Sequence, residues 1–227
     1  MIVGVAFVPS APLMFLDVDV EHLLDDLRDA SIELIREFEP MARRVIIIGS
    51  DTTTHWYMNG GIGSSRGFGG IADYSIGSSA EVLPLSLAVG AAVLEAAAWD
   101  TDVIALSVAS HSTYSERAKL AGEVVAQAVA VPTLLVVVGD GSATRTEKAP
   151  GYVQPDAIAF DAEIAEALGS ADVDALVSVT QDRADRLWCQ GLPAWQVAAS
   201  AVPSAQGVLA LQSAPFGVNY LVASWRP

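Results

Sequence analysis

The chain has 227 residues, of which 52% are hydrophobic and only 17% are charged, and its formal net charge is −15. A chain of this length and composition can bury a large apolar core, which excludes intrinsic disorder. A surface this acidic repels phosphate backbones and anionic lipids. We therefore expect no nucleic-acid partner and no membrane association. The hydrophobic excess predicts a large core, a buried face between copies of the chain, or both, and a homo-oligomer is therefore expected.

Nearly continuous apolar runs rich in β-branched residues predict buried strands that are covered on both faces. These runs are Ile2–Val8, Val45–Ile48, Asp102–Val108 and Leu134–Val138. Helical patterns fill the gaps at Val20–Phe38, Leu85–Ala98 and Ser115–Ala130, with Ser112, Thr113 or Ser115 available to cap the last of them. This alternation predicts an α/β fold with a mainly parallel central sheet and helices on both faces.

The pattern changes after residue 155. Short consecutive helices are predicted at Asp156–Leu168, Asp172–Val177, Gln181–Cys189 and Pro193–Ala201. Two final runs, Gly207–Leu211 and Val218–Trp225, predict a C-terminal antiparallel hairpin. No segment has the composition of a linker, so a single domain over residues 1–227 is expected. The glycine- and serine-rich stretch Asn59–Ser79 predicts either a lid over a pocket or a mobile excursion.

Small, polar and acidic residues follow three of the predicted strands. Ser10 follows the first strand, Asp51 and Thr52 follow the second, and Asp140 and Ser142 follow Leu134–Val138. Because ligands of open α/β sheets bind beyond the carboxyl ends of the strands, these residues predict a pocket in which Asp51 faces the same cavity as Ser10 and Asp140. The alternative is that they only cap helices and form turns, as aspartate, serine and glycine often do.

The remaining reactive side chains each have two interpretations. His55, four residues after Asp51, is either a ligand or general base at the pocket mouth or an ordinary loop residue, and His111 sits at another strand exit. His22 is expected on the surface. Arg66 or Arg145 could bind a carboxylate, or each could simply be solvated. The one cysteine, Cys189, can form no internal disulfide and is expected to be inert.

Several segments together resemble the subunit-B superfamily of class III extradiol ring-cleavage dioxygenases, which also contains the Memo-type proteins. The matching segments are Phe7-Val8-Pro9-Ser10-Ala11-Pro12-Leu13, Ile46-Ile47-Ile48-Gly49-Ser50-Asp51, Val138-Gly139-Asp140-Gly141-Ser142-Ala143, Lys148-Ala149-Pro150-Gly151-Tyr152, Ala159-Phe160-Asp161 and Ala214-Pro215-Phe216-Gly217-Val218-Asn219-Tyr220. The resemblance extends over nearly the whole chain, and it implies the same α/β fold.

The resemblance also implies a mononuclear Fe(II) held by two histidines and a carboxylate. In this sequence Ser10 and Thr52 stand where the family has its two ligand histidines, and Ala143 stands where it has its catalytic histidine. Oxidoreductase activity is therefore implied by the resemblance only, and the residues favour a divergent, metal-free homologue without a cofactor. The family's glutamate ligand has no assigned position here.

Three hypotheses about function follow. The preferred one is a pocket that binds a small polar or aromatic molecule through Ser10, Asp51, Thr52, His55, Asp140 and Ser142. The second is an active Fe(II)- or Zn-dependent dioxygenase or hydrolase that uses substitute ligands among Asp51, His55, Asp140 and His111. The third is a non-catalytic, oligomeric interaction protein. The apolar N-terminus lacks a basic region and is interrupted by Pro9 and Pro12, so no signal peptide is predicted and a cytoplasmic location is expected.

Overall fold

The computed structural model describes residues 1–227, and its centre is a seven-stranded sheet in the order β3-β6-β2-β7-β1-β9-β8. The strands are β1 (Ile2–Val8), β2 (Arg44–Asp51), β3 (His55–Tyr57), β6 (Asp102–Ala109), β7 (Thr133–Val138), β8 (Gln206–Ser213) and β9 (Tyr220–Arg226). Strands β6, β2, β7 and β1 are parallel, whereas β3 and the hairpin β8–β9 join the two edges through antiparallel pairs. The mainly parallel sheet and the C-terminal hairpin are as predicted, and no helix is long and apolar enough to cross a membrane.

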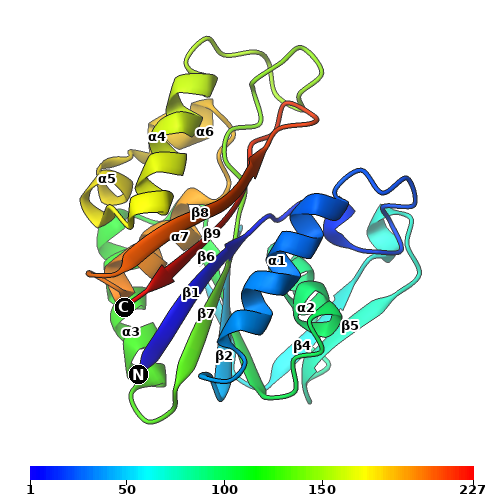
Figure 1. Ribbon diagram of the computed structural model, residues 1–227, viewed down its shortest axis with the longest axis vertical. Coiled ribbons are helices and arrows are strands. Elements are labelled where there is room, and N and C mark those ends of the chain that lie inside the picture. Colours follow the sequence, from blue (N-terminus) through cyan, green and yellow to red (C-terminus); the bar gives the residue numbers. More distant parts are fainter.

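Helices cover both faces of this sheet (Figure 1). They are α1 (Asp25–Phe38), α2 (Leu85–Ala96), α3 (Tyr114–Ala128), α4 (Ala157–Ser170), α5 (Val173–Ser178), α6 (Gln181–Arg186) and α7 (Leu192–Ala201). Helices α1 and α2 pack on one face, and α3, α4 and α7 pack on the other, with 33 buried residues in each layer. Because alternate residues of a strand enter opposite layers, both sets must be apolar, which explains the continuous apolar runs.

Two helix starts show how local hydrogen bonds set the element boundaries. Helix α3 begins after Thr113, whose hydroxyl accepts from the Glu116 N–H in a capping box. Helix α1 begins at Asp25 rather than at Val20, which corrects the predicted start. The buried Asp19 carboxylate accepts hydrogen bonds from two backbone N–H groups, those of Leu23 and Leu24, and so holds the chain in a loop up to the helix.

The glycine-rich stretch is an ordered hairpin, which corrects the prediction of a lid or a mobile excursion. Strands β4 (Gly60–Ser64) and β5 (Asp73–Gly77) form a separate two-stranded sheet that packs beside α2 (Figure 1). A Cβ atom at Gly63 would lie 2.5 Å from the Cβ of Ala88 in α2. Here glycine permits close packing against a helix, so the composition does not indicate mobility.

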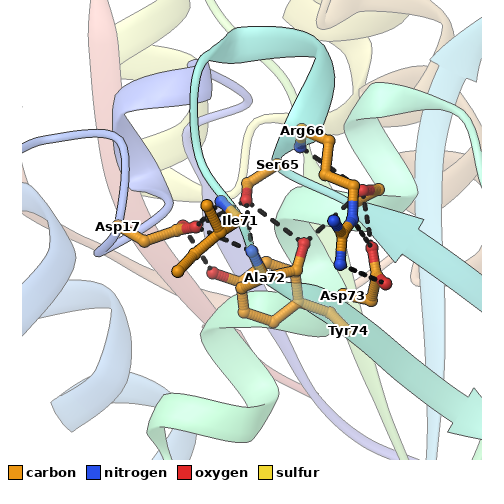
Figure 2. A network of polar contacts seen from close by, with 8 residues as sticks. Asp17, Ser65, Arg66, Ile71, Ala72, Asp73 and Tyr74 are labelled. Carbon is orange, nitrogen blue, oxygen red and sulfur yellow. Dashed lines mark hydrogen bonds and ion pairs between the residues drawn. The ribbon is translucent and has the colours of Figure 1, made fainter.

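The tip of this hairpin is anchored by Asp17, which lies in the loop before α1 (Figure 2). Its carboxylate accepts hydrogen bonds from the Ser65 hydroxyl at 2.7 Å, the Ile71 N–H at 2.6 Å, the Ala72 N–H at 2.9 Å and the Tyr74 hydroxyl at 3.0 Å. Partial burial raises the pKa of Asp17, but these four donors outweigh it and lower the pKa to about 2. The segment is therefore tied to the body of the protein.

Candidate functional site

A cavity of about 420 Å³ opens beyond the carboxyl ends of the parallel strands. Its wall contains residues that follow β1, β2, β6 and β7, together with the start of α2 and residues of α6 and α7. The lining residues are Ser10, Ser50, Asp51, Thr52, Leu85, Ser86, Ser110, Val138, Gly139, Gln181, Ala184, Asp185, Trp188, Cys189, Gln190 and Pro193.

The position of the cavity follows from the connections of the strands. The chain leaves β2 toward α2 on one face, and it leaves β7 toward α4–α7 on the other face. Adjacent connections that diverge in this way leave a crevice at the end of an α/β sheet. The Ser86 hydroxyl donates to the Ser50 carbonyl at 2.9 Å, which fixes the first turn of α2 at the edge of this crevice.

Ser10 and Asp140 form a hydrogen-bonded pair at the base of the site. The Ser10 N–H donates to Asp140 Oδ1 at 2.8 Å, and the Ser10 hydroxyl donates to Asp140 Oδ2 at 3.0 Å. Burial raises the pKa of Asp140 to about 6, although both hydrogen bonds from Ser10 favour the ionised form. A carboxyl with such a pKa can accept or release a proton near neutral pH.

Two other polar groups of the wall have no partner in the protein. No hydrogen bond or ion pair involves the carboxylate of Asp51, which is half-buried at the end of β2. The adjacent Ser50 Oγ is buried and also lacks a hydrogen-bond partner. Because buried polar atoms are nearly always hydrogen-bonded in proteins, the Ser50 hydroxyl points to a molecule that enters the cavity, and the partly exposed Asp51 carboxylate beside it is free to bind one.

Another part of the wall combines a carboxylate with an aromatic ring. Asp185 in α6 accepts a hydrogen bond from Gln181 Nε2 at 2.6 Å. Trp188 follows α6 with a left-handed backbone (φ 56°), and its side chain is 49% exposed. This is the usual conformation of the residue after a helix C-cap: the Trp188 N–H donates to the Asp185 carbonyl at 3.1 Å and the Cys189 N–H donates to the Ala184 carbonyl at 2.9 Å, which ends α6 and leaves the indole half-exposed at the cavity.

The structure brings together only part of the predicted set. Ser10, Asp51 and Thr52 line the cavity, and Asp140 lies behind Ser10. Ser142 is fully buried instead, where its hydroxyl donates to Asp161 Oδ2 at 2.6 Å and takes no part in the cavity wall. His55 belongs to β3 and does not line the cavity. Its Nε2 atom instead lies 3.0 Å from the exposed Glu81 carboxylate.

The other sequence candidates also have local roles or lie away from the site. His111 is exposed and does not line the cavity, although its neighbour Ser110 does. Arg66 is paired with Asp73 on the hairpin, at 3.1 Å. Arg145 lies 3.6 Å from the Asp161 carboxylate and also contacts Asn219. Neither arginine is available to a ligand in this cavity.

The residues present do not fit the iron centre that the family resemblance implies. The Ser10 hydroxyl is already used by Asp140, Thr52 is exposed at the rim, and Ala143 has no donor atom. No three histidine, cysteine, aspartate or glutamate side chains lie in an arrangement that could hold a metal ion. Such a centre needs two imidazoles and a carboxylate directed at one metal ion. His55 and His111 cannot supply the imidazoles, because neither lines the cavity.

Sequence reasoning missed the wall made by Gln181, Asp185, Trp188 and Gln190. The helix at Gln181–Cys189 was predicted, but nothing in its pattern indicates that it returns to the strand ends. Ser50 and Ser110 could have been found, because each lies at the end of a predicted strand. Cys189 lines the cavity as a buried thiol, and burial raises its pKa above that of an ordinary cysteine.

No protein-family model matches the chain, and no curated protein matches it either. Among solved structures, the crystal structure of an uncharacterized protein from Escherichia coli K12 is similar, with a TM-score of 0.64 and 12% sequence identity. The match covers 99% of this chain and 100% of that one. At this level of identity the likeness establishes a shared fold and nothing about activity.

Proposed function

We propose that this protein binds a small molecule in the strand-end cavity, using its own hydroxyl, amide and carboxylate groups without a metal ion held by its side chains. The observation that carries the proposal is the pairing of an open cavity of about 420 Å³ with polar groups that nothing in the protein satisfies, the Asp51 carboxylate and the Ser50 hydroxyl.

The size and lining of the cavity support this proposal. Small-molecule sites are concave, have volumes of about 300 to 1,000 Å³, and combine apolar walls with a few polar groups. In this cavity the apolar surface comes from Leu85, Val138, Trp188 and Pro193. The polar groups stand on secondary-structure elements or directly at their ends, which is where a site can be held in fixed geometry.

The pair of Ser10 and Asp140 is the part of the site that can move a proton. When Asp140 is ionised it accepts a hydrogen bond from the Ser10 hydroxyl, which orients the hydroxyl oxygen to accept a hydrogen bond from a ligand. When Asp140 is protonated, this orientation is lost. Ligand binding and proton uptake at this carboxyl are therefore coupled.

The proposal is tested by titrating ¹⁵N-labelled protein with phenol, benzoate, benzylamine and benzamide, which share one ring and differ in charge and hydrogen bonding. We expect at least one probe to shift the amide resonances of Ser10, Ser50 and Thr52. A mostly apolar pocket of about 460 Å³ that contains Val125 and Val129 is a control site on the same molecule. Shifts confined to that pocket, or none at all, would contradict the proposal.

Elemental analysis of protein purified without chelators tests the metal-free part of the proposal. We expect iron and zinc well below one equivalent per chain. One bound equivalent that is lost in an Asp51→Asn variant would instead establish a metal site with substitute ligands and overturn the metal-free part of the proposal.

A further inference from the structure

We infer that the ligand of the strand-end cavity is a small organic cation, with an ammonium group directed to Asp51 and Asp185 and an apolar body against Trp188. This inference rests on the binding function proposed above and specifies the chemical class of its ligand. The sequence suggests an anionic ligand instead, because Arg66 and Arg145 are its candidates for binding a carboxylate.

The charge of the wall carries the argument. Asp51 and Asp185 are the only charged side chains among the residues that line the cavity, and no lysine, arginine or histidine is among them. An anion placed there would face two carboxylates without a compensating cation, whereas an ammonium group would gain charge-assisted hydrogen bonds from them. The ionised Asp140 behind Ser10 adds negative charge at the base of the site.

A buried arginine behind the wall does not reverse this balance. Arg117 is 2% exposed and is absent from the lining. Its guanidinium donates to the Ser112 hydroxyl at 3.0 Å, to Gln196 Oε1 at 2.8 Å and to the Ser110 carbonyl at 3.2 Å. It also donates to Gln181 Oε1, so its hydrogen-bonding capacity is largely used inside the protein.

The starts of α2 and α7 are the other sources of positive potential at the cavity. Helix α2 begins at Leu85 without a side-chain cap, and a helix N-terminus is equivalent to roughly half a positive charge. Helix α7 begins at Leu192, also without a side-chain cap, and its neighbours Gln190 and Pro193 line the cavity. Together with Arg117 these two helix starts oppose about two of the three carboxylates in and behind the wall. The remaining charge is negative, and the formal net charge of −15 on the whole chain has the same sign.

Trp188 completes the recognition of a cation. An ammonium group over the face of an indole gains about 0.5 to 2 kcal/mol from the ring quadrupole, and tryptophan is the best of the aromatic residues in this role. Trp188 lies three residues after Asp185 and lines the same cavity. A carboxylate and an aromatic face from α6 and the residues after it, with a second carboxylate at the end of β2, line one cavity and suit an amine with an apolar body.

Three probes of nearly equal size separate the possible charges of the ligand. They are 2-phenylethylamine, 2-phenylethanol and 3-phenylpropanoate, each measured at pH 7.5 and constant ionic strength by the shift of the Trp188 indole N–H resonance, assigned from a Trp188→Phe variant. We expect 2-phenylethylamine to bind at least about ten-fold more tightly than the alcohol or the acid, as one charge-assisted hydrogen bond implies.

Matched variants locate the cation. Asp51→Asn should weaken binding of 2-phenylethylamine by about ten-fold or more, whereas binding of 2-phenylethanol should change little. Asp182→Asn is the control, because Asp182 is an exposed aspartate of the same helix as Asp185 and does not line the cavity. This control removes the same charge and should change affinity by no more than about two-fold, since salt screens distant surface charges. Trp188→Leu should weaken binding, and Trp188→Phe should retain most of it, as followed by the Ser50 and Thr52 amides.

The outcomes separate the two proposals. If 3-phenylpropanoate or 2-phenylethanol binds as tightly as the amine and shifts the same resonances, the cation inference is wrong and the binding function stands. If the amine binds equally well to the wild type and to Asp51→Asn, the inference is also wrong. If none of the three probes, and none of the four simpler ones, shifts a cavity resonance, the binding function falls together with the inference.

Discussion

Replacing Asp140 by asparagine should change the pH dependence of folding stability in a defined direction. Burial raises the pKa of this carboxyl from 3.8 to about 6, so the folded state resists its ionisation. Between these two pH values the Asp140 carboxyl is ionised in the unfolded state but keeps its proton in the folded state. The carboxyl therefore costs no stability below pH 3.8, and the free energy of unfolding decreases as the pH rises through 6.

The size of this effect follows from the same pKa difference. The difference from 3.8 to about 6 corresponds to a full penalty of about 3 kcal/mol. The Asp140 side chain is only half-buried, so solvent screening reduces this to about 2 kcal/mol. About half of the penalty accumulates between pH 5 and pH 8, where the carboxyl loses its proton in the folded state.

Asparagine keeps the shape and the hydrogen bonds of this position. Its amide oxygen can accept from the Ser10 N–H, and its amide nitrogen can donate to the Ser10 hydroxyl. We therefore expect the stability of Asp140→Asn, relative to the wild type, to increase by about 1 kcal/mol between pH 5 and pH 8. Urea unfolding followed by tryptophan fluorescence at several pH values measures this difference, with Asp182→Asn as the control. A difference that stays constant with pH would refute the reasoning, because Asp140 would then have an ordinary pKa.

Three further predictions concern other parts of the fold. Asp17→Asn should lower stability at pH 7 by about 1 to 2 kcal/mol and increase hydrogen exchange at Ile71 and Ala72, because the Asp17 carboxylate accepts their N–H groups. Since the folded-state pKa of Asp17 is lowered to about 2, the wild type should lose this stabilisation only as the pH falls from 3.8 toward 2. Unchanged hydrogen exchange in the variant would contradict the anchoring role. Gly63→Ala should cost about 1 to 3 kcal/mol in chemical denaturation, since its methyl group would lie 2.5 Å from the Ala88 Cβ, and a neutral effect would show that the hairpin is loosely packed on α2. Cys189 should react slowly with a thiol reagent in the native protein and rapidly in urea, because it is buried with a raised pKa; rapid native reaction would show that the cavity wall opens.

The sheet could be predicted because its strands are encoded locally. A run such as Ile2–Val8 must serve two apolar layers at once, and the structure has the strand at these same bounds. Ser10, Asp51 and Thr52 could be placed at the cavity for a related reason, since strand direction alone puts them at one edge of the sheet.

The rest of the site depends on tertiary contacts that no local pattern shows. His55 follows Asp51 closely, but β3 turns back along β6, and the pairing of His55 with Ser107 directs the chain away from the cavity. The wall made by α6 depends on the buried Gln196, whose amide donates to the Leu176 carbonyl at 2.9 Å and the Val179 carbonyl at 3.0 Å. Such long-range hydrogen bonds are invisible to periodicity, which reports only the buried face of each helix.

The distribution of satisfied and unsatisfied carboxylates is a physical argument for where the function lies. Asp17 and Asp19 each accept several hydrogen bonds, and these lower the pKa of both groups against the effect of burial. At the strand ends burial outweighs the two hydrogen bonds from Ser10 and raises the pKa of Asp140, and Asp51 has no partner in the protein. Burial also raises the pKa of Asp161, which pairs with Ser142 away from the cavity. A fold that satisfies its carboxylates elsewhere could do so here by a single substitution, such as asparagine at position 140. Stability alone would favour that change, and the proposed binding of a cation supplies a functional reason for a charge at this position.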